Sequence, residues 1–394
     1  MRLVSLLAVL ASPAIATLAM AEVDQGPPNA SFAPAFPAQT RAPALPATAV
    51  SASLFAGGLE NPWGIATLPD GNYLVTERPG RLRPVSATGV VGAPIDGLPE
   101  VETRQQGGLL DVAISPEFAT DRRVFWTYAT DSWRGRATAA ATGILSADAT
   151  RMTDVELIFR QSQAIRGSGV HYGARIVPDG AGHVFITTGD RGMNDDAALL
   201  MDPGEDLGKV MRLIADGTEP ADNPLAGIAD AGDVWTLGHR NVQGAALDGD
   251  GTLWTVEHGP RGGDELNRLE PGANHGWPVV SYGIDYGGDP VGGGLSNDPG
   301  FVEPVYYWDP VIAPGGMAFY AGAMFPDWQG DVLIASLNPG GLVRLRMADN
   351  RVAGEERLLP DLGRVRDVEV LADGSILLLT DSGDGGIWRV TPGN

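Results

Sequence analysis

The stretch ARIVPDGAGHVFITTG (residues 174–189) contains the pattern that decides the fold. Two short apolar runs flank Asp179-Gly180, a dipeptide that favours tight turns because glycine tolerates positive φ. The runs are rich in Val, Ile and Phe and are bounded by Gly and Pro, as β-strands are. This stretch therefore predicts a β-hairpin.

The same strand–turn–strand pattern recurs along the chain from about residue 51 onward, six copies in all. The chain provides about 57 residues per copy, which is enough for a four-stranded blade with a long loop. Sheets of this kind repeated around an axis form a β-propeller. A stacked solenoid fits less well because the copies vary in spacing and carry large insertions. We predict an all-β, six-bladed β-propeller of four-stranded antiparallel blades over residues 51–394. The other copies are WGIATLPDGNYLVTE (63–77), LLDVAISPEFATDRRVFWTYA (109–129), AALDGDGTLWTVEHG (245–259), MAFYAGAMFPDWQGDVLIAS (317–336) and VEVLADGSILLLTD (368–381).

The composition agrees with a turn-rich β protein and excludes several classes of function. Hydrophobic residues make up 43% of the 394, and the chain has Gly 54 and Pro 30. The net charge of −22 repels phosphate, which argues against nucleic acid and anionic membranes as partners. Without cysteine there are no disulfides, zinc-thiolate sites or iron–sulfur clusters. No GxGxxG, Walker or GxSxG motif supports nucleotide chemistry or an α/β-hydrolase triad.

The N-terminus has the features of an export signal. Residues 1–21 combine Arg2, a short apolar stretch interrupted by Pro13, and a small-x-small cleavage site before Glu22. No later segment is long and apolar enough to span a bilayer. We expect cleavage of 1–21 and a soluble periplasmic protein, with residues 22–50, rich in Pro and Ala, as a disordered tail or linker.

Two groups of polar residues stand out before any family is considered. His171 precedes the third repeat's first strand and Asp190 ends its partner strand, so a hairpin brings them to one end of the blade. Arg364 and Arg366 lie two apart at a strand start, which places both on one face, where they suit a polycarboxylate ligand. A structural histidine and surface ion pairs remain the alternatives for these residues.

A third group of polar residues lies between residues 238 and 267. GHRNVQG (238–244) offers His239, Arg240, Asn241 and Gln243 in one turn. EHGPRGGDELN (257–267) then combines a Gly-Pro turn with carboxylates, a set of oxygen donors that suits a hard cation such as Ca²⁺. By spacing alone, a solvated acidic loop is an equally good interpretation.

These segments together resemble the soluble quinoprotein sugar dehydrogenases of the glucose/sorbosone dehydrogenase family, most closely their aldose sugar dehydrogenase branch. The resemblance covers about residues 51–394. It implies a six-bladed propeller that carries pyrroloquinoline quinone (PQQ) and calcium and oxidises the C1 hydroxyl of aldoses to lactones by hydride transfer to PQQ. It rests on QQGGLLDVAISPEF (105–118), HYGARIV (171–177), TTGDRG (187–192), GKVMRL (208–213), GHRNVQG, EHGPRGGDELN, GANHGWP (272–278), GGMAFY (315–320) and RVRDV (364–368).

The resemblance also implies a role for each matching position. His171 matches the general base, Asp190 the carboxylate that orients it, and Gln106 a substrate-side glutamine. Gly259 and Pro260 match the carbonyl ligands of the cofactor calcium, which polarises the quinone. Glu265 and His275 match the ligand positions of a second, structural calcium. The positions that match cofactor contacts are Arg240, Asn241, Gln243, Trp308, Arg364 and Arg366.

Three positions depart from the family pattern. Asn338 stands where relatives often carry a lysine that pairs with the quinone, and the only lysine, Lys209, lies in another motif. His275 replaces a tyrosine, and His258 replaces the polar residue often found before Gly-Pro. The metal residues are therefore less securely matched than His171.

Two other classes of function stay open at this stage. Six-bladed propellers also serve as calcium-dependent lactonases or hydrolases, which need a carboxylate- or Asn-lined metal and no arginine clamp. A non-catalytic propeller that binds a glycan or a protein partner would need no His171. The dehydrogenase interpretation requires an aldose and an external electron acceptor, because no haem motif is present, and it allows a monomer or a homodimer.

Overall fold

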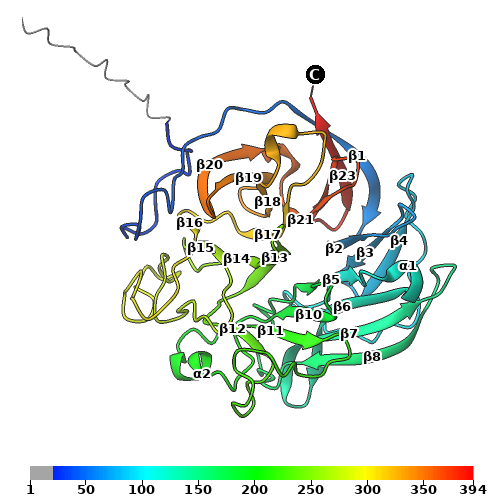
Figure 1. Cartoon of the computed structure of the whole chain (residues 1–394), viewed down its shortest axis with the longest axis horizontal. Coiled ribbons are helices and arrows are strands. Elements are labelled where there is room, and N and C mark those ends of the chain that lie inside the picture. The colour runs from blue at the N-terminus through cyan, green and yellow to red at the C-terminus, as the bar shows by residue number, and fades with distance from the viewer. Residues whose placement is uncertain (1–20, 394) are drawn as a thin grey trace, which may run out of the picture.

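The computed structural model describes residues 21–393. The predicted targeting sequence therefore lies outside the described residues, except for Ala21. The described chain forms six antiparallel sheets arranged around a central axis (Figure 1). The predicted six-bladed β-propeller is confirmed.

Five sheets have four strands and the first has three. Each blade begins with its innermost strand and proceeds outward, except that the last blade takes its outermost strand from the start of the chain. The strands in blade order are β2 (Pro62–Thr67), β3 (Tyr73–Glu77) and β4 (Arg81–Val85); β5 (Leu109–Ile114), β6 (Arg123–Ser132), β7 (Gly135–Leu145) and β8 (Met152–Arg160); β9 (Ile176–Pro178), β10 (His183–Thr187), β11 (Lys209–Ile214) and β12 (Val234–Leu237); β13 (Val242–Leu247), β14 (Leu253–Glu257), β15 (Asp264–Arg268) and β16 (Tyr306–Trp308); β17 (Pro314–Phe319), β18 (Val332–Ser336), β19 (Leu342–Ala348) and β20 (Arg351–Leu358); and β21 (Val365–Val370), β22 (Ile376–Thr380), β23 (Gly385–Pro392) and β1 (Val50–Leu59).

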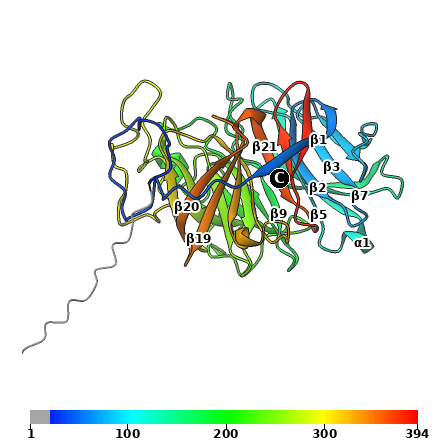
Figure 2. The ribbon, with the colours of Figure 1, turned by 90° about the horizontal axis from the view of Figure 1, so that it is seen from above.

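The innermost strands form a closed ring. β2 contacts β5 and β21, and the contacts continue from β5 through β9, β13 and β17 to β21. A second closure involves β1, the outermost strand of the sixth blade, which pairs antiparallel with β23 (Figures 1 and 2). Both ends of the described chain therefore contribute strands to the sixth blade. This pairing ties residues from opposite ends of the chain, as in Val50 with Pro392.

Apolar cores fill the interfaces between neighbouring blades. The central strands are buried on both faces because each blade packs on two neighbours, which explains unbroken apolar runs such as ILLLT in β22. The interface of blades 1 and 2, for example, contains Leu74, Trp126 and Leu145, all fully buried. The core therefore lies in six layers around the axis, and polar residues are left to the channel and the loops.

Residues 22–49 do not form the expected disordered linker. They pack along the outer side of blades 4 and 5 (Figure 1). Ala42 joins the apolar core between these blades. The Gln39 side chain is buried and donates to the Pro304 carbonyl at 3.0 Å, and Arg41 donates to the Asp309 carbonyl at 2.8 Å. This correction has a long-range cause: main-chain carbonyls some 265 residues away accept hydrogen bonds from a segment that has no secondary-structure period of its own.

Helices are few and short. They are α1 (Phe118–Asp121) and α2 (Ala197–Met201), with 3₁₀ turns at Pro326–Trp328 and Pro360–Leu362. The Asp196 side chain caps α2 by accepting from the Leu199 N–H at 3.1 Å.

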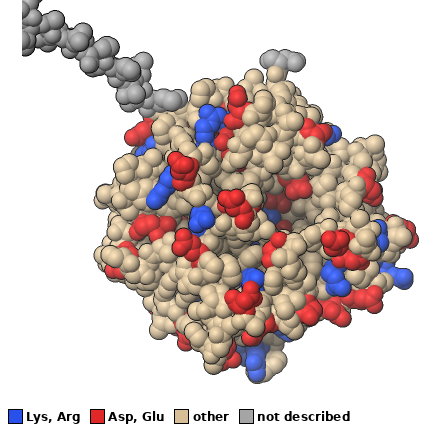
Figure 3. Space-filling view, viewed as in Figure 1, with Lys and Arg blue, Asp and Glu red and all other residues tan. Residues whose placement is uncertain are grey.

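Among residues 21–393, no helix has the length and apolarity needed to cross a membrane. Acidic and basic side chains are interspersed over the face shown in Figure 3, so the net negative charge is not gathered into one patch there.

Candidate active site

A polar cavity of about 180 Å³ lies where the innermost strands begin. All six strands start at this end of the channel, so residues far apart in sequence converge there. Trp63, Asn241 and Arg366 lie near the starts of β2, β13 and β21. The cavity is lined by Trp63, Arg78, Gln106, Leu110, Tyr172, Gly173, Asn241, Gln243, His258, Ala313, Leu337, Arg364, Arg366 and Asp381.

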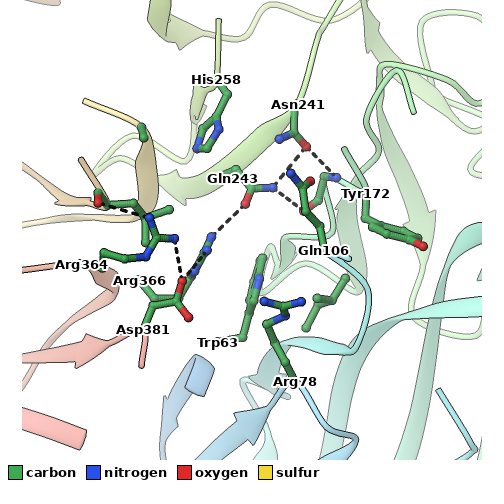
Figure 4. A pocket seen from close by; sticks show the side chains of 14 residues that line it. Trp63, Arg78, Gln106, Tyr172, Asn241, Gln243, His258, Arg364, Arg366 and Asp381 are labelled. Atoms are coloured by element: carbon green, nitrogen blue, oxygen red, sulfur yellow. Dashed lines mark hydrogen bonds and ion pairs between the residues drawn. The ribbon is translucent and has the colours of Figure 1, made fainter. Parts of the chain in front are cut away.

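The two predicted clamp arginines do face the same way. Arg364 and Arg366 reach the same carboxylate oxygen, Asp381 Oδ2, at 2.9 and 3.0 Å (Figure 4). Burial alone would raise the pKa of Asp381, but the two guanidinium groups lower it to about 2. The group of three therefore carries a net positive charge at the cavity wall.

Arg366 has a donor left for a ligand. Its side chain is buried, and its Nε–H has no acceptor among the described residues. A buried guanidinium with an unused N–H is costly unless an acceptor arrives, so this wall suits a carboxylate-bearing ligand. Arg364 is about half exposed, which makes it the outer member of the pair.

An amide network connects the clamp to the opposite wall. Gln243 Oε1 accepts from Arg366 at 3.1 Å, and Gln243 Nε2 donates to Asn241 Oδ1 at 3.2 Å and to the Gly173 carbonyl at 3.1 Å (Figure 4). Asn241 Oδ1 also accepts from the Gly173 N–H at 3.1 Å. The predicted cofactor residues Asn241, Gln243 and Arg366 therefore form one connected wall.

His171 lies beside the cavity, next to the lining residues Tyr172 and Gly173. Its backbone is left-handed with φ of 50°, and its N–H donates to Gln106 Oε1 at 2.8 Å. The loop lies so close to Gly189 that a Cβ there would come within 2.1 Å of the His171 carbonyl oxygen, which only glycine avoids. Gln106 and His171 are thus brought together from different blades.

The predicted pair of His171 and Asp190 forms as expected. His171 Nδ1 lies 2.6 Å from Asp190 Oδ1, and Asp190 also accepts from Trp277 Nε1 at 2.9 Å and from the Gly192 N–H at 2.8 Å. A carboxylate that accepts from Nδ1–H leaves Nε2 as the free acceptor of the ring. This arrangement provides a positioned base with one fixed tautomer.

Burial and charge keep this base neutral. Burial lowers the pKa of His171, and it outweighs the Asp190 hydrogen bond that would raise it. Burial would raise the pKa of Asp190, but the His171 hydrogen bond and charge together with Arg240 hold it below its usual value. At neutral pH the pair is therefore a neutral imidazole beside a carboxylate.

The predicted calcium ligands lie on the next loop, where Arg240 already contacts one of them. The Gly259 carbonyl accepts from Arg240 Nη1 at 2.7 Å, and the adjoining His258 carbonyl does so at 3.2 Å. Pro260 is buried beside them. Their carbonyls are neutral oxygen donors of the kind that hard cations accept, and the nearby guanidinium disfavours a cation that arrives without an anionic ligand.

His258 contributes a neutral ring to the cavity wall. Its Nε2 lies 2.8 Å from the Pro314 carbonyl, which only accepts, so Nε2 carries the hydrogen. Burial lowers the pKa of His258 to about 3. The ring is a permanent neutral group at the position where the family pattern has another polar residue.

The second predicted metal position corresponds to a cavity of about 10 Å³, shared by Glu265, Glu257 and His275. Burial raises the pKa of Glu265 well above its usual range, and the charge of Glu257 adds to this effect. Neither ring nitrogen of His275 has a partner among the described residues. Within residues 21–393, no group of three or more His, Asp or Glu side chains has the geometry to hold a metal ion.

Trp308 does not line the cavity, contrary to the prediction. It is fully buried in the core between blades 4 and 5, where Nε1 points to Glu355 Oε1 at 3.3 Å. Trp63, which the sequence comparison missed, supplies the aromatic wall instead. It follows the same rule as Asn241 and Arg366, because it lies near the start of an innermost strand.

Lysine plays no part in the cavity. Asn338 is exposed and only its neighbour Leu337 lines the wall. Lys209 is buried in β11 and donates to the carbonyls of Leu200 and Leu207, both at 2.8 Å. The positive charge of the site therefore comes from arginines alone. Besides Trp63, sequence reasoning also missed Arg78, Tyr172 and Asp381. Tyr172 lies within HYGARIV and Asp381 ends the sixth repeat copy, but neither was given a role.

A family model described as Glucose / Sorbosone dehydrogenase matches residues 59–389. The chain belongs to the glucose/sorbosone dehydrogenase family. Aldose sugar dehydrogenase YliI of Escherichia coli (strain K12) is 38% identical over 359 residues, covering 89% of this chain and 95% of the relative. Quinoprotein glucose dehydrogenase B of Acinetobacter calcoaceticus is 26% identical over 402 residues, covering 82% of this chain and 84% of the relative.

Solved structures agree with this family membership. The apo form of the soluble aldose sugar dehydrogenase of Escherichia coli superimposes with a TM-score of 0.83 at 36% identity, covering 87% of this chain and 99% of that one. The PQQ-bound aldose sugar dehydrogenase of Streptomyces coelicolor gives a TM-score of 0.71 at 29% identity, covering 88% and 99%. As a member of the glucose/sorbosone dehydrogenase family, this protein is an oxidoreductase.

The unused donors in and beside the cavity show whether the residues present fit a polycarboxylate cofactor. The unused Nε–H of Arg366 and that of Arg240 are both buried and lack acceptors among residues 21–393. The aromatic face of Trp63 and the amides of Asn241 and Gln243 complete the wall. These donors fit an anionic aromatic ligand such as PQQ.

Proposed function

We propose that this chain is an exported quinoprotein that oxidises the C1 hydroxyl of aldose sugars to lactones. The observation that carries the proposal is the His171–Asp190 pair, held at 2.6 Å beside a cavity whose wall has three arginines and an unused buried N–H. The family and the PQQ-bound relative from Streptomyces coelicolor support the choice of cofactor. The name of the Escherichia coli relative supports aldoses as the class of substrate.

His171 acts as the general base in this proposal. Its neutral Nε2 takes the proton from the anomeric hydroxyl, and Asp190 stabilises the imidazolium that forms. Gln106, whose Oε1 is fixed by the His171 N–H, presents its amide beside the same point and orients the sugar. When bound, PQQ would accept the hydride from C1, and Ca²⁺ would polarise the quinone as a Lewis acid.

Arg364 and Arg366 hold the carboxylates of the cofactor, and Asn241, Gln243 and Arg240 bind its other polar edge. The carbonyls of Gly259 and Pro260 supply the protein ligands of the cofactor calcium. Glu265, with the main chain at His275, holds a second calcium that has a structural role. An external acceptor would be needed to reoxidise the cofactor. The N-terminal sequence directs the chain to the periplasm.

The experiment that tests this function compares two reactions on the same metal-free protein. We would add PQQ with and without Ca²⁺ and follow dye reduction across a panel of aldoses, with lactone hydrolysis measured in parallel. PQQ- and calcium-dependent dye reduction supports the dehydrogenase. Calcium-dependent lactone hydrolysis without dye reduction would instead support a lactonase. The absence of both reactions would support a non-catalytic binding propeller.

A further inference from the structure

Arg175 is a buried arginine that the proposed chemistry does not use. It lies two residues after the cavity-lining pair Tyr172 and Gly173 and immediately precedes β9. Its side chain reaches strands of other blades. Nη1 lies 3.0 Å from Asp111 Oδ1 in β5, and Nη2 lies 3.0 Å from Asp367 Oδ1 in β21. Nε donates to the Gln243 carbonyl in β13 at 2.5 Å.

The two remaining innermost strands also meet this guanidinium. Its carbon atom lies 4.3 Å from the centre of the Trp63 ring in β2. In β17, a Cβ on Gly316 would lie 1.7 Å from Asp367 Oδ1 and 2.8 Å from Arg175 Nη2, so only glycine leaves room for this ion pair. One side chain therefore touches all six blades at the axis.

This side chain also separates two spaces. Trp63 and Gln243 line the candidate site above it. Below it, a second cavity of about 380 Å³ is lined by Arg175, Asp111, Asp367 and Glu369 together with apolar residues of the innermost strands. Arg175 and its two carboxylates thus form the layer that closes the channel under the candidate site.

We propose that Arg175 is a positioning residue for cofactor binding. It holds the Trp63 ring from beneath and fixes the strand that carries Gln243, and it thereby keeps the aromatic and amide walls in register. This inference rests on the proposed function for its cofactor, but the position of Trp63 is a property of the cofactor-free protein. Arg175 makes no contact with substrate and takes part in no bond change.

The position of Trp63 depends on the shape of Arg175 as well as its charge. A planar guanidinium stacks on an aromatic ring while it donates to two carboxylates and a carbonyl, whereas an ammonium group is a compact point charge. Arg175→Lys therefore retains a cation between Asp111 and Asp367, so that these buried acids stay compensated. It loses the stacking contact and the Nε hydrogen bond.

The chain offers a matched control in blade 5. Arg344 is also buried, lies 4.7 Å from the centre of the Trp328 ring, and pairs with Glu356 at 3.2 Å and Asp331 at 3.5 Å. It does not line the candidate site. Arg344→Lys makes the same chemical change at a buried arginine–tryptophan pair that is remote from the cofactor wall.

The experiment measures three quantities in the wild type and both variants. They are the melting temperature, the ¹⁹F NMR resonance of Trp63 in cofactor-free protein labelled with 5-fluorotryptophan, and the Kd for PQQ in the presence of Ca²⁺. Trp63→Phe assigns the resonance. We expect both lysine variants to melt at lower temperature, and only Arg175→Lys to shift or broaden the Trp63 resonance and to weaken PQQ binding by at least ~10-fold.

An unchanged Trp63 resonance and an unchanged Kd in a folded Arg175→Lys protein would overturn the inference and leave Arg175 a purely structural residue. If wild type binds no PQQ, the proposed function fails, while the Trp63 resonance still decides the role of Arg175. Should Arg175→Lys not fold, Asp111→Asn weakens the hold on the same guanidinium. That variant must shift or broaden the Trp63 resonance relative to wild type, and an unmoved resonance would contradict the inference.

Discussion

At the scale of single residues, the proposed function assigns catalysis to His171 and to the carboxylate that fixes its tautomer. We predict that His171→Gln lowers kcat by about 10²–10⁴-fold, the usual contribution of a positioned base, while the Kd for PQQ stays near the wild-type value. Steady-state dye reduction and a PQQ titration measure the two quantities. The matched control is His183→Gln, because His183 also pairs with an aspartate, Asp179, at 2.9 Å but lies outside the cavity. Turnover that survives in His171→Gln would remove it from the role of base.

The pH dependence of kcat/KM follows from the same pair. Burial lowers the pKa of His171 below 6.5, so the base is neutral at pH 7 and activity is lost only as the pH falls through that lowered pKa. Asp190→Asn removes a negative charge that raises this pKa. We predict that the acid limb of the pH profile moves to still lower pH in Asp190→Asn, while the maximal rate falls at least ~10-fold because the tautomer is no longer fixed. An acid limb that moves to higher pH would contradict this electrostatic account.

The residue scale also shows where sequence reasoning ends. His171 and Asp190 were predictable because one hairpin joins them, and Arg364 and Arg366 because strand period places them on one face. Trp308 was wrongly assigned to the cavity wall, since a motif match cannot say which side of a blade a buried tryptophan packs on. Trp63 lies on a strand of another blade, and only the closed ring brings it to the site. Asp381 directly follows β22, the hairpin partner of β21, so the hairpin rule that predicts the pair of His171 and Asp190 would also have found it.

At the scale of structural elements, we propose that the start of β21 is an anion clamp with an inner arginine, Arg366, and an outer arginine, Arg364. We predict that Arg366→Met weakens PQQ binding by ~10–100-fold, because a buried charge-assisted contact is lost, and that Arg364→Met weakens it by only a few-fold because its side chain is about half exposed. Equilibrium titration with PQQ in the presence of Ca²⁺ measures both values. Equal losses for the two variants, or a larger loss for Arg364→Met, would contradict the order of burial.

The segment 22–49 is the second element with a testable role. We predict that a chain beginning at residue 50 melts about 2–5 °C lower, because it loses the buried hydrogen bonds of Gln39 and Arg41 and the packing of Ala42. Its Kd for PQQ should not change, since no residue of the segment lines the candidate site. Calorimetry of both chains measures the difference, and an unchanged melting temperature would mean that the docked segment adds no stability.

The hairpins were predictable at this scale because Asp-Gly turns and their flanking strands are local in sequence. The docking of 22–49 was not, because it depends on acceptors such as the carbonyls of Pro304 and Asp309. The first blade has three strands where we expected four. Counting repeats gives the number of blades, but it does not say how many strands pair within each blade.

At the scale of the whole molecule, the propeller concentrates cations inside an acidic protein. The net charge is −22, yet Arg364, Arg366 and Arg240 lie at or beside one cavity. Fixed charges in a cavity act at close range, whereas dispersed surface charges are screened by salt. The fold therefore allows an anionic ligand to bind to a molecule that repels anions at a distance.

Calcium and PQQ should bind cooperatively for the same electrostatic reason. The proposed ligands Gly259 and Pro260 are neutral carbonyls, and Arg240 Nη1 lies 2.7 Å from the first of them, so Ca²⁺ alone gains little there. We predict that PQQ tightens calcium binding at this site at least ~10-fold and that calcium tightens PQQ binding by the same factor. Calorimetric titrations in both orders measure the coupling, with Glu265→Gln separating any contribution of the second site. Independent binding would contradict this arrangement.

The central claim, that His171 serves sugar oxidation by bound PQQ, is tested most directly by an anaerobic single-turnover titration. Protein loaded with PQQ and Ca²⁺ is mixed with one equivalent of an aldose, and the absorbance of the cofactor and the lactone formed are measured together, in wild type and in His171→Gln. The account predicts one lactone per cofactor reduced in wild type, and the same spectral change about 10²–10⁴-fold more slowly in the variant. A loaded protein whose cofactor spectrum does not respond to any aldose, or responds equally fast without His171, would contradict it.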